Sequence, residues 1–189
     1  MTTVLAIESS ARADGLTATV AKACLEGAAE AGATTELVQL KDLALERCRM
    51  CGETGWGLCL SEGRCVIEDD FAGLVSKIRA ADAYVFATPV YFSDLSESMK
   101  AFTDRLRRIS GFDKGNRPLG KKPTVLVAAA GGSGGGTVHC LAELDRTLNV
   151  CGAFAIDHIG AAQRNKSYKP DVARRTGRAL AEAAVSKKD

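Results

Sequence analysis

Four cysteines lie close together in the second quarter of the chain, and they are Cys48, Cys51, Cys59 and Cys65. Their spacing is C-x2-C-x7-C-x5-C. Thiolates this close in sequence can converge on one metal ion or one iron–sulfur cluster. The alternatives are reduced thiols on a surface loop and a redox disulfide. A chelating C-x2-C turn followed by short gaps favours a metal site, and we place iron–sulfur ahead of zinc.

The other three cysteines lie outside this segment. Cys24 falls on the apolar face of one expected helix, and Cys140 and Cys151 lie near another. Because free cysteine often behaves as a small buried hydrophobic residue, we expect none of the three to bind a metal. An odd total of seven cysteines favours reduced thiols or metal ligands over a disulfide framework, as expected in the cytoplasm.

The composition excludes several classes of function. A formal net charge of +2 gives no basic surface of the kind that nucleic-acid-binding proteins use. The longest apolar run, Val125–Ala130, is far too short to cross a bilayer. The N-terminus runs directly into apolar Val4–Ile7, so we expect no signal peptide. We therefore expect a cytoplasmic protein with no membrane span and no nucleic acid partner.

The elements that must position the cysteines alternate along the chain. Five short apolar segments are predicted to be strands, at residues 4–7, 36–40, 83–87, 125–130 and 154–159. Helical spacing is clearest in the stripe made by Leu95, Met99, Phe102, Leu106 and Ile109. Asp94 and Glu97 have capping-box spacing at the start of that helix. The acids at 68–70 are expected in the first turn of an earlier helix.

Strands that alternate with helices predict a parallel sheet covered by helices on both faces. We predict a three-layer, flavodoxin-like α/β fold whose five-stranded parallel sheet has the order 2-1-3-4-5. No linker divides the chain, so we expect one domain over 1–189 with a cysteine-rich loop at about 41–67. Ligands bind such sheets beyond the carboxyl ends of the strands, where strand order reverses. The loops after strands 1, 3 and 4 should meet there.

These three loops suit a flat ligand that carries a phosphate. After strand 1 come hydroxyls, a cation and a glycine before a helix, in Ser9, Ser10, Arg12, Gly15 and Thr17. Unpaired N–H groups at a helix N-terminus favour a phosphate. After strand 3, Tyr91 and Phe92 add aromatic surface beside the rigid Pro89. The loop at 131–136 contains only glycine and serine, so its backbone can approach a flat ligand closely.

Other sites built on glycine-rich loops fit less well. The glycines do not form G-x-G-x-x-G after the first strand, which disfavours a Rossmann dinucleotide site, and the G-K-[ST] of a P-loop is missing. Residues 131–135 match the spacing of a nucleophile elbow. Five similar glycines and serines make that match weak, however, and the chain is short for an α/β-hydrolase. We assign no role to the two histidines, His139 and His158.

Three motifs resemble those of the NADPH-dependent FMN reductase family, in particular its iron–sulfur flavoprotein branch. Residues 10–17, S-A-R-A-D-G-L-T, are similar to the family's phosphate loop S-P-R-x-x-G-N-T. Residues 88–93, T-P-V-Y-F-S, are similar to its S-P-V-Y-F-G segment, and a helix with residues 99–105 follows. Residues 65–70, C-V-I-E-D-D, match the end of its cysteine segment. The resemblance covers nearly the whole chain.

The chain departs from the family pattern at a few positions. Ala11 replaces a proline and Leu16 an asparagine of the phosphate loop, and Ser93 replaces a glycine. The branch spaces its cysteines as about C-x2-C-x2-C-x5-C. Here Thr54 stands at the third position and Cys59 comes five residues later. An iron–sulfur cluster, a zinc ion and free thiols therefore all remain open for this loop.

The resemblance implies FMN as the cofactor, held by the three loops. The residues implied in FMN binding are Ser9, Ser10, Arg12, Gly15, Leu16, Thr17, Thr88, Pro89, Val90, Tyr91, Phe92, Ser93, Gly131, Gly132, Ser133 and Gly134. The implied ligands of a [4Fe–4S] cluster, or of zinc, are Cys48, Cys51, Cys59 and Cys65. No side chain stands out as a catalytic acid or base, because the cofactor does the redox chemistry.

The implied function is an FMN-dependent oxidoreductase that moves electrons between NAD(P)H or a redox partner and a flavin, quinone or similar acceptor. The alternatives are a non-enzymatic electron carrier, and an NAD(P)H:acceptor reductase with structural zinc or free thiols. Because the cysteine loop follows strand 2, next to strand 1, we expect a cluster on the flavin side of the fold. The resemblance also implies a homodimer or homotetramer.

Overall fold

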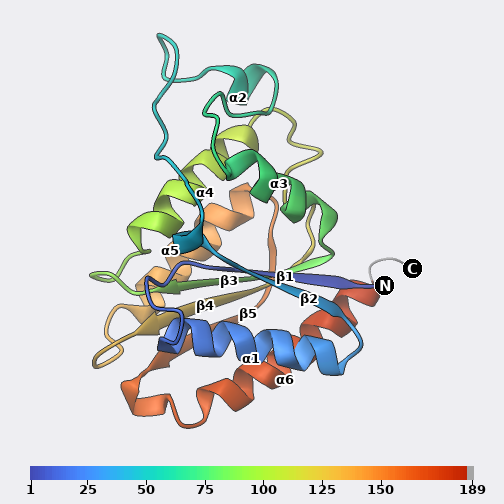
Figure 1. Ribbon diagram of the computed structural model, residues 1–189, viewed down its shortest axis with the longest axis vertical. Coiled ribbons are helices and arrows are strands. Elements are labelled where there is room, and N and C mark those ends of the chain that lie inside the picture. The colour runs from blue at the N-terminus through green and yellow to red at the C-terminus, as the bar shows by residue number, and fades with distance from the viewer. Residues whose placement is uncertain (187–189) are drawn as a thin grey trace.

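The computed structural model describes residues 1–186 and contains one parallel sheet between two helical layers (Figure 1). The strands are β1 (Thr3–Glu8), β2 (Thr34–Gln39), β3 (Ala83–Pro89), β4 (Pro123–Ala130) and β5 (Phe154–Ala162). They lie in the order β2-β1-β3-β4-β5, and every neighbouring pair is parallel. The predicted three-layer α/β fold and flavodoxin-like strand order are confirmed. The last three residues of the expected 1–189 domain lie outside the described residues.

Helices cover both faces of the sheet, as Figure 1 shows. One face carries α1 (Leu16–Glu30) and α6 (Lys169–Val185), and the other carries α3 (Phe71–Ala80), α4 (Glu97–Ile109) and α5 (Thr137–Val150). Short turns of helix occur at η1 (Leu40–Asp42), α2 (Leu58–Ser61) and η2 (Gln163–Asn165). The central strands β1, β3 and β4 are buried on both faces, so their alternate residues contribute to two separate cores. Every helix in the described part of the chain is too short or too polar to cross a bilayer.

Two glycines let α1 and α6 pack with their backbones in contact. A Cβ added at Gly177 would lie 1.9 Å from the backbone oxygen of Cys24. A Cβ added at Gly27 would lie 1.8 Å from the backbone oxygen of Arg174. Such overlap would force the helices apart, and overpacking of this kind typically costs about 1–3 kcal/mol. These contacts hold α1, the helix that follows the loop after β1, against α6.

Three local expectations were wrong, for identifiable reasons. Strand β3 runs through Pro89, past its predicted end at Ala87, because a missing N–H is tolerated at the last residue of the strand. Ser96, not Asp94, caps α4, since Ser96 Oγ accepts from Met99 N at 3.3 Å. The acids at 68–70 precede α3 instead of lying in its first turn. Asp69 nevertheless serves that helix, because its Oδ1 accepts from Phe71 N at 3.1 Å.

The three cysteines expected to be buried are confirmed as such. Cys24, Cys140 and Cys151 are all fully enclosed in the two cores. Burial raises the pKa of Cys24 and of Cys140 to about 12, and that of Cys151 to about 11. These side chains therefore remain protonated thiols near neutral pH. Metals bind the thiolate form, so burial disfavours metal binding at these positions, and that they hold no metal stays a prediction.

Candidate functional site

The loop that follows β1 is fixed against β3 and the start of α4. Ser9 N donates to Ala87 O at 3.0 Å, and Ser9 Oγ donates to the same oxygen at 3.3 Å. Ser96 Oγ donates to Ser9 Oγ at 2.8 Å. Thr88 Oγ1 accepts from Ser96 N at 3.1 Å, and Ser98 Oγ donates to Ser9 O at 3.3 Å. Hydroxyl groups thus join the ends of β1 and β3, and the loops after these two strands lie together, as predicted.

A buried carboxyl group braces the same loop from the sheet side. Glu8 Oε1 accepts from Ser10 N at 2.6 Å, and Glu8 Oε2 accepts from Gln39 Nε2 at 3.1 Å. Burial raises the pKa of Glu8, although the hydrogen bonds from Gln39 and Ser10 act in the opposite direction. Ser10 Oγ in turn accepts from Arg12 N at 3.1 Å. The backbone from Glu8 to Arg12 is therefore held in one shape before any ligand binds.

The N-terminus of α1 opens beside an exposed cation. No side chain in the described residues caps this helix, and Gly15 N donates to Arg12 O at 3.3 Å, so the N–H groups of Leu16 and Thr17 are the ones available to an anion. The side chain of Arg12 is 79% exposed, and its Nε lies 3.6 Å from Asp14 Oδ1. An ion pair this exposed is weak, so Arg12 can turn toward a ligand at little cost. Gln163 and Lys166, from the segment after β5, line the same groove.

The turn after β3 is tight and carries an exposed ring at its tip. Tyr91 N donates to Asp94 O at 2.9 Å, and Asp94 N donates to Tyr91 O at 3.0 Å. Between them, Phe92 and Ser93 have φ of 49° and 71°, a strained conformation for residues other than glycine. Phe92 is fully exposed and Tyr91 is partly exposed. Backbone strain of this kind collects at functional sites, and exposed rings offer surface to a flat ligand.

The glycine-rich loop after β4 touches both neighbouring loops. A Cβ at Gly136 would lie 2.6 Å from Ser93 Oγ, and one at Gly134 would lie 2.9 Å from Ala162 Cβ. Both glycines also have positive φ, so each is required by the path of the chain. Open space surrounds the first two glycines of the loop, Gly131 and Gly132. The loops after β1, β3 and β4 thus meet at one edge of the sheet.

The four clustered cysteines line one narrow cavity. Cys48, Cys51, Cys59 and Cys65 all contribute to its wall, together with residues from α4. Within residues 1–186, however, no three side chains of the metal-binding types are close enough together to hold one metal ion. Four thiols are a donor set that suits a thiophilic metal or cluster, and all four cysteines face one shared cavity wall. Binding would require the loop to draw these sulfurs inward.

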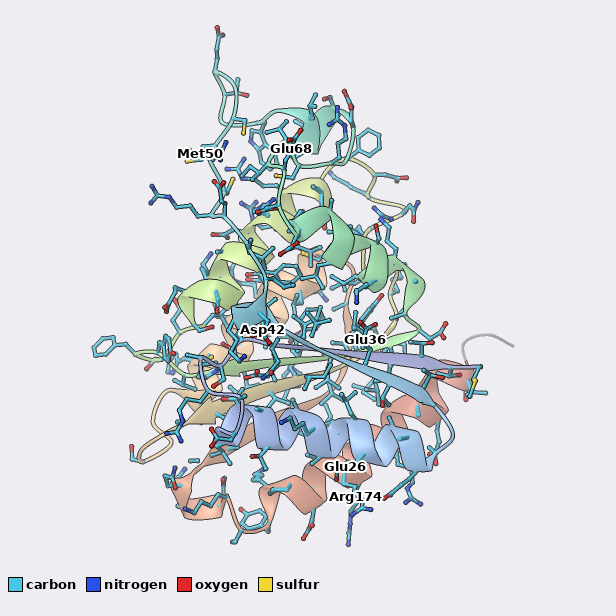
Figure 2. The ribbon with its side chains drawn as sticks, viewed as in Figure 1. Glu26, Glu36, Asp42, Met50, Glu68 and Arg174 are labelled. Carbon is cyan, nitrogen blue, oxygen red and sulfur yellow. The ribbon has the colours of Figure 1, made fainter. Side chains whose placement is uncertain are left out.

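Two arginines of α4 hold the cysteine loop over the end of that helix. Arg105 Nη1 donates to Asp69 Oδ2 at 2.6 Å and to Glu46 O at 2.9 Å. Arg108 Nη1 donates to Gly55 O at 2.5 Å, and its guanidinium carbon lies 4.5 Å from the ring centroid of Trp56. Figure 2 shows the loop rising from Asp42 near the sheet toward Met50, with Glu68 on the returning arm.

The cysteine loop begins beside the loops after β1, β3 and β4 but then extends away from them over α4. It leaves β2 at the edge where those loops meet, but Figure 1 shows it standing over the far end of α4. From Glu97 to Arg105 the helix rises about 12 Å, at 1.5 Å per residue. Strand order fixes only where a loop begins, and the expectation of a cluster on the flavin side of the fold stays a prediction.

Sequence reasoning missed the residues that support the site. Arg105 lies on the apolar stripe of α4, three residues after Phe102 and four before Ile109. An arginine on a buried face is rarely left without a partner, so this position carried a readable signal. Its partner Asp69, 36 residues away, carried none. Ser96 was hidden by the competing capping pattern that begins two residues earlier.

Comparison with known proteins assigns the family. A sequence profile of the NADPH-dependent FMN reductase family matches residues 2–167. An iron–sulfur flavoprotein of Methanocaldococcus jannaschii is 33% identical over 132 residues, which is 69% of this chain and 64% of that relative. Another, from Methanosarcina thermophila, is 28% identical over 82% of this chain and 78% of its own length. The chain thus spans slightly less than two thirds of the first relative.

A solved structure supports the fold independently. The NAD(P)H:quinone oxidoreductase of Methanothermobacter marburgensis superposes with a TM-score of 0.73 over 95% of this chain and 96% of that protein. At 22% identity, this likeness establishes the architecture alone. With the profile match over most of the chain, the conclusion is that this chain belongs to the NADPH-dependent FMN reductase family, in its iron–sulfur flavoprotein branch, a family of FMN-dependent oxidoreductases.

Proposed function

We propose that this chain binds FMN at the edge where the loops after β1, β3 and β4 meet, and uses it to transfer electrons. The donor is NAD(P)H or a redox partner protein, and the acceptor is a flavin, a quinone or a similar compound. The observation that carries the proposal is the convergence of the hydroxyl-rich, aromatic and glycine-rich loops at one edge of the sheet. The family assignment supports the same cofactor.

The residues divide the work of binding between phosphate and ring. Arg12, the hydroxyls of Ser10 and Thr17, and the N–H groups at the start of α1 hold the phosphate. The loops at 88–93 and 131–136 hold the isoalloxazine, the first with aromatic side chains and the second with backbone alone. When bound, FMN supplies both one-electron and two-electron redox chemistry. The protein orients the cofactor, excludes water from one face of the flavin ring and sets the reduction potential of the flavin. None of these roles requires a catalytic acid or base, and we assign none.

In the cysteine loop we propose a [4Fe–4S] cluster held by Cys48, Cys51, Cys59 and Cys65. Two observations support it: all four cysteines line one cavity, and the curated relatives are named iron–sulfur flavoproteins. A cluster there would pass single electrons between FMN and a partner, or to a flavin of a neighbouring subunit. Because the length of α4 separates the cysteine loop from the proposed FMN site of the same chain, electron transfer to the flavin of a neighbouring subunit is favoured. We therefore propose a homodimer or homotetramer.

Steady-state oxidation of NAD(P)H by the purified, FMN-loaded protein tests the proposed activity. Turnover with a quinone or free flavin as acceptor is expected. An electron carrier would exchange electrons with a reduced partner but would not oxidise NAD(P)H catalytically. If only a partner protein reduces the bound FMN, the electron-carrier function is correct and the enzymatic function is not. If the protein binds no FMN, both functions are wrong.

Arg12→Ala is expected to weaken FMN binding by about 1.5–3 kcal/mol, the scale of a hydrogen bond to a charged group. That corresponds to roughly a tenfold to 150-fold higher Kd. Fluorescence titration of apoprotein with FMN measures it, and riboflavin should show no such loss because it lacks the phosphate. Arg146→Ala is the control, since Arg146 is similarly exposed and paired with Glu143 on α5. An unchanged FMN affinity in Arg12→Ala would show that the phosphate lies elsewhere.

Gly135→Val is expected to reduce FMN affinity while leaving the free energy of unfolding nearly unchanged. A Cβ at Gly135 meets only Ser133 Oγ, at 3.5 Å, so the chain tolerates a side chain there. The valine would instead occupy space in front of the loop that we assign to the ring. Gly136→Val is the contrasting variant, because a Cβ there collides with Ser93 and should cost stability. If Gly135→Val binds FMN normally, the loop does not contact the flavin.

A further inference from the structure

Arg105 is the most deeply buried charged residue of the cysteine-loop region. Its side chain is 1% exposed, and that of its partner Asp69 is 6% exposed. Nη1 donates to Asp69 Oδ2 at 2.6 Å, and Nη2 donates to Asp69 Oδ1 at 2.9 Å, a two-pronged ion pair. The guanidinium carbon lies 4.2 Å from the ring centroid of Phe71. These contacts leave the guanidinium group no freedom to swing away.

The same guanidinium group also faces the thiols. Nη2 donates to Cys65 Sγ at 3.4 Å, and Arg105 lines the cavity that the four cysteines share. Its Nε is buried and has no hydrogen-bond partner among the described residues. A buried donor without a partner is unfavourable, and Arg105 lines the cysteine cavity, so a ligand held there could supply the missing acceptor. Sulfur atoms of a bound cluster are acceptors of this kind.

Charge decides what this arrangement would do to such a cluster. Reduction adds one electron, so the reduced form is more negative than the oxidised form. A fixed cation and hydrogen bonds to the ligand sulfur stabilise the more negative form, and these are established levers on cluster potentials. Asp69 offsets part of the charge, but the guanidinium lies between the carboxylate and Cys65, so the sulfur is contacted by the positive group.

We propose that Arg105 raises the reduction potential of the iron–sulfur cluster through Cys65, acting as a positioning residue that exchanges no electrons itself. The inference rests on the proposed cluster in the cysteine loop. The competing explanation is that the Arg105–Asp69 pair only fastens the loop to α4. The two explanations differ in one measurable quantity, the midpoint potential of the bound cluster.

The test uses protein prepared and kept anaerobic with FMN bound. Redox titration followed by electron paramagnetic resonance of the reduced cluster gives its midpoint potential, with iron content measured on the same samples. Arg105→Lys keeps the positive charge but loses the paired hydrogen bonds to Asp69 and the hydrogen bond to Cys65. Arg105→Gln combined with Asp69→Asn removes both charges without leaving either one buried alone. Arg107→Gln, on the same helix but outside the cavity wall, is the matched control.

Both Arg105 variants are expected to retain iron and to shift the reduction equilibrium at least tenfold toward the oxidised form. For one electron this is about 59 mV lower in midpoint potential. Arg107→Gln should stay near the wild-type value. Retained iron with an unchanged potential in both variants overturns the inference but leaves the proposed function standing. Loss of iron from both variants also overturns it, because Arg105 would then serve assembly. Wild-type protein without iron overturns the inference together with the proposed cluster.

Discussion

Cys51→Ser is expected to remove nearly all bound iron while FMN remains bound. A [4Fe–4S] cluster held by four thiolates contains about four irons per chain, and serine oxygen is a poor replacement for the soft sulfur ligand. Cys51 also sits at the tightest part of the loop, between Met50 and Gly52, whose φ values are 50° and 73°. A Cβ at Gly57 would lie 3.3 Å from Cys51 Cβ, so the turn closes directly on this residue. Few other positions could compensate for its loss.

Iron and zinc analysis of anaerobically purified protein, with its absorption spectrum, measures the outcome. The wild type should show broad absorption beyond that of FMN, and Cys51→Ser should show FMN alone. Cys140→Ala is the matched control, because Cys140 lies fully buried in the core and should leave the iron content unchanged. Zinc in place of iron would favour the structural-metal alternative, since four thiolates suit it equally well. Wild-type protein with neither metal would leave the cysteines as thiols or a redox disulfide.

The sequence predicted the layers and strand order of this fold because each strand carries its own signal. Five apolar runs separated by helical stripes admit few arrangements once parallel pairing is assumed. The buried stripe of α4, including Met99 and Phe102, was read correctly for the same reason. The loops after β1, β3 and β4 could also be placed together, since the carboxyl ends of parallel strands share one edge of the sheet.

The path of the cysteine loop could not be predicted in this way. Its position depends on side-chain contacts between distant residues, above all Arg105 with Asp69 and Arg108 with Gly55. Such pairs leave no periodic pattern, and a four-residue helix like α2 is too short to produce one. The sequence identified the four sulfurs but could not show that they stand over the far end of α4.

Asp69→Ala is expected to lower the free energy of unfolding by about 3–5 kcal/mol, the cost of leaving a buried charge without its partner. Arg105 would keep its positive charge in a site that is 1% exposed, and the loop would lose the acceptor that also binds Glu46 N at 2.8 Å. Urea unfolding under anaerobic conditions measures the change. Asp104→Ala is the control, since Asp104 pairs with Lys100 on the surface of α4 and such pairs contribute about 0–1 kcal/mol.

The same substitution should also alter how stability depends on pH. Burial would raise the pKa of Asp69, but hydrogen bonds from Arg105 and from the N–H groups of Glu46 and Phe71 outweigh it and hold the pKa below its ordinary value. A depressed pKa means that the carboxylate stabilises the fold fully above its ordinary pKa of about 3.9, and that this contribution is lost as pH falls through the lower, folded value. Asp69→Ala should therefore lack this component of acid destabilisation, so its deficit relative to wild type shrinks below about pH 4. A deficit that stays constant between pH 7 and strongly acidic conditions would show that the ion pair is not what holds the cysteine loop to α4.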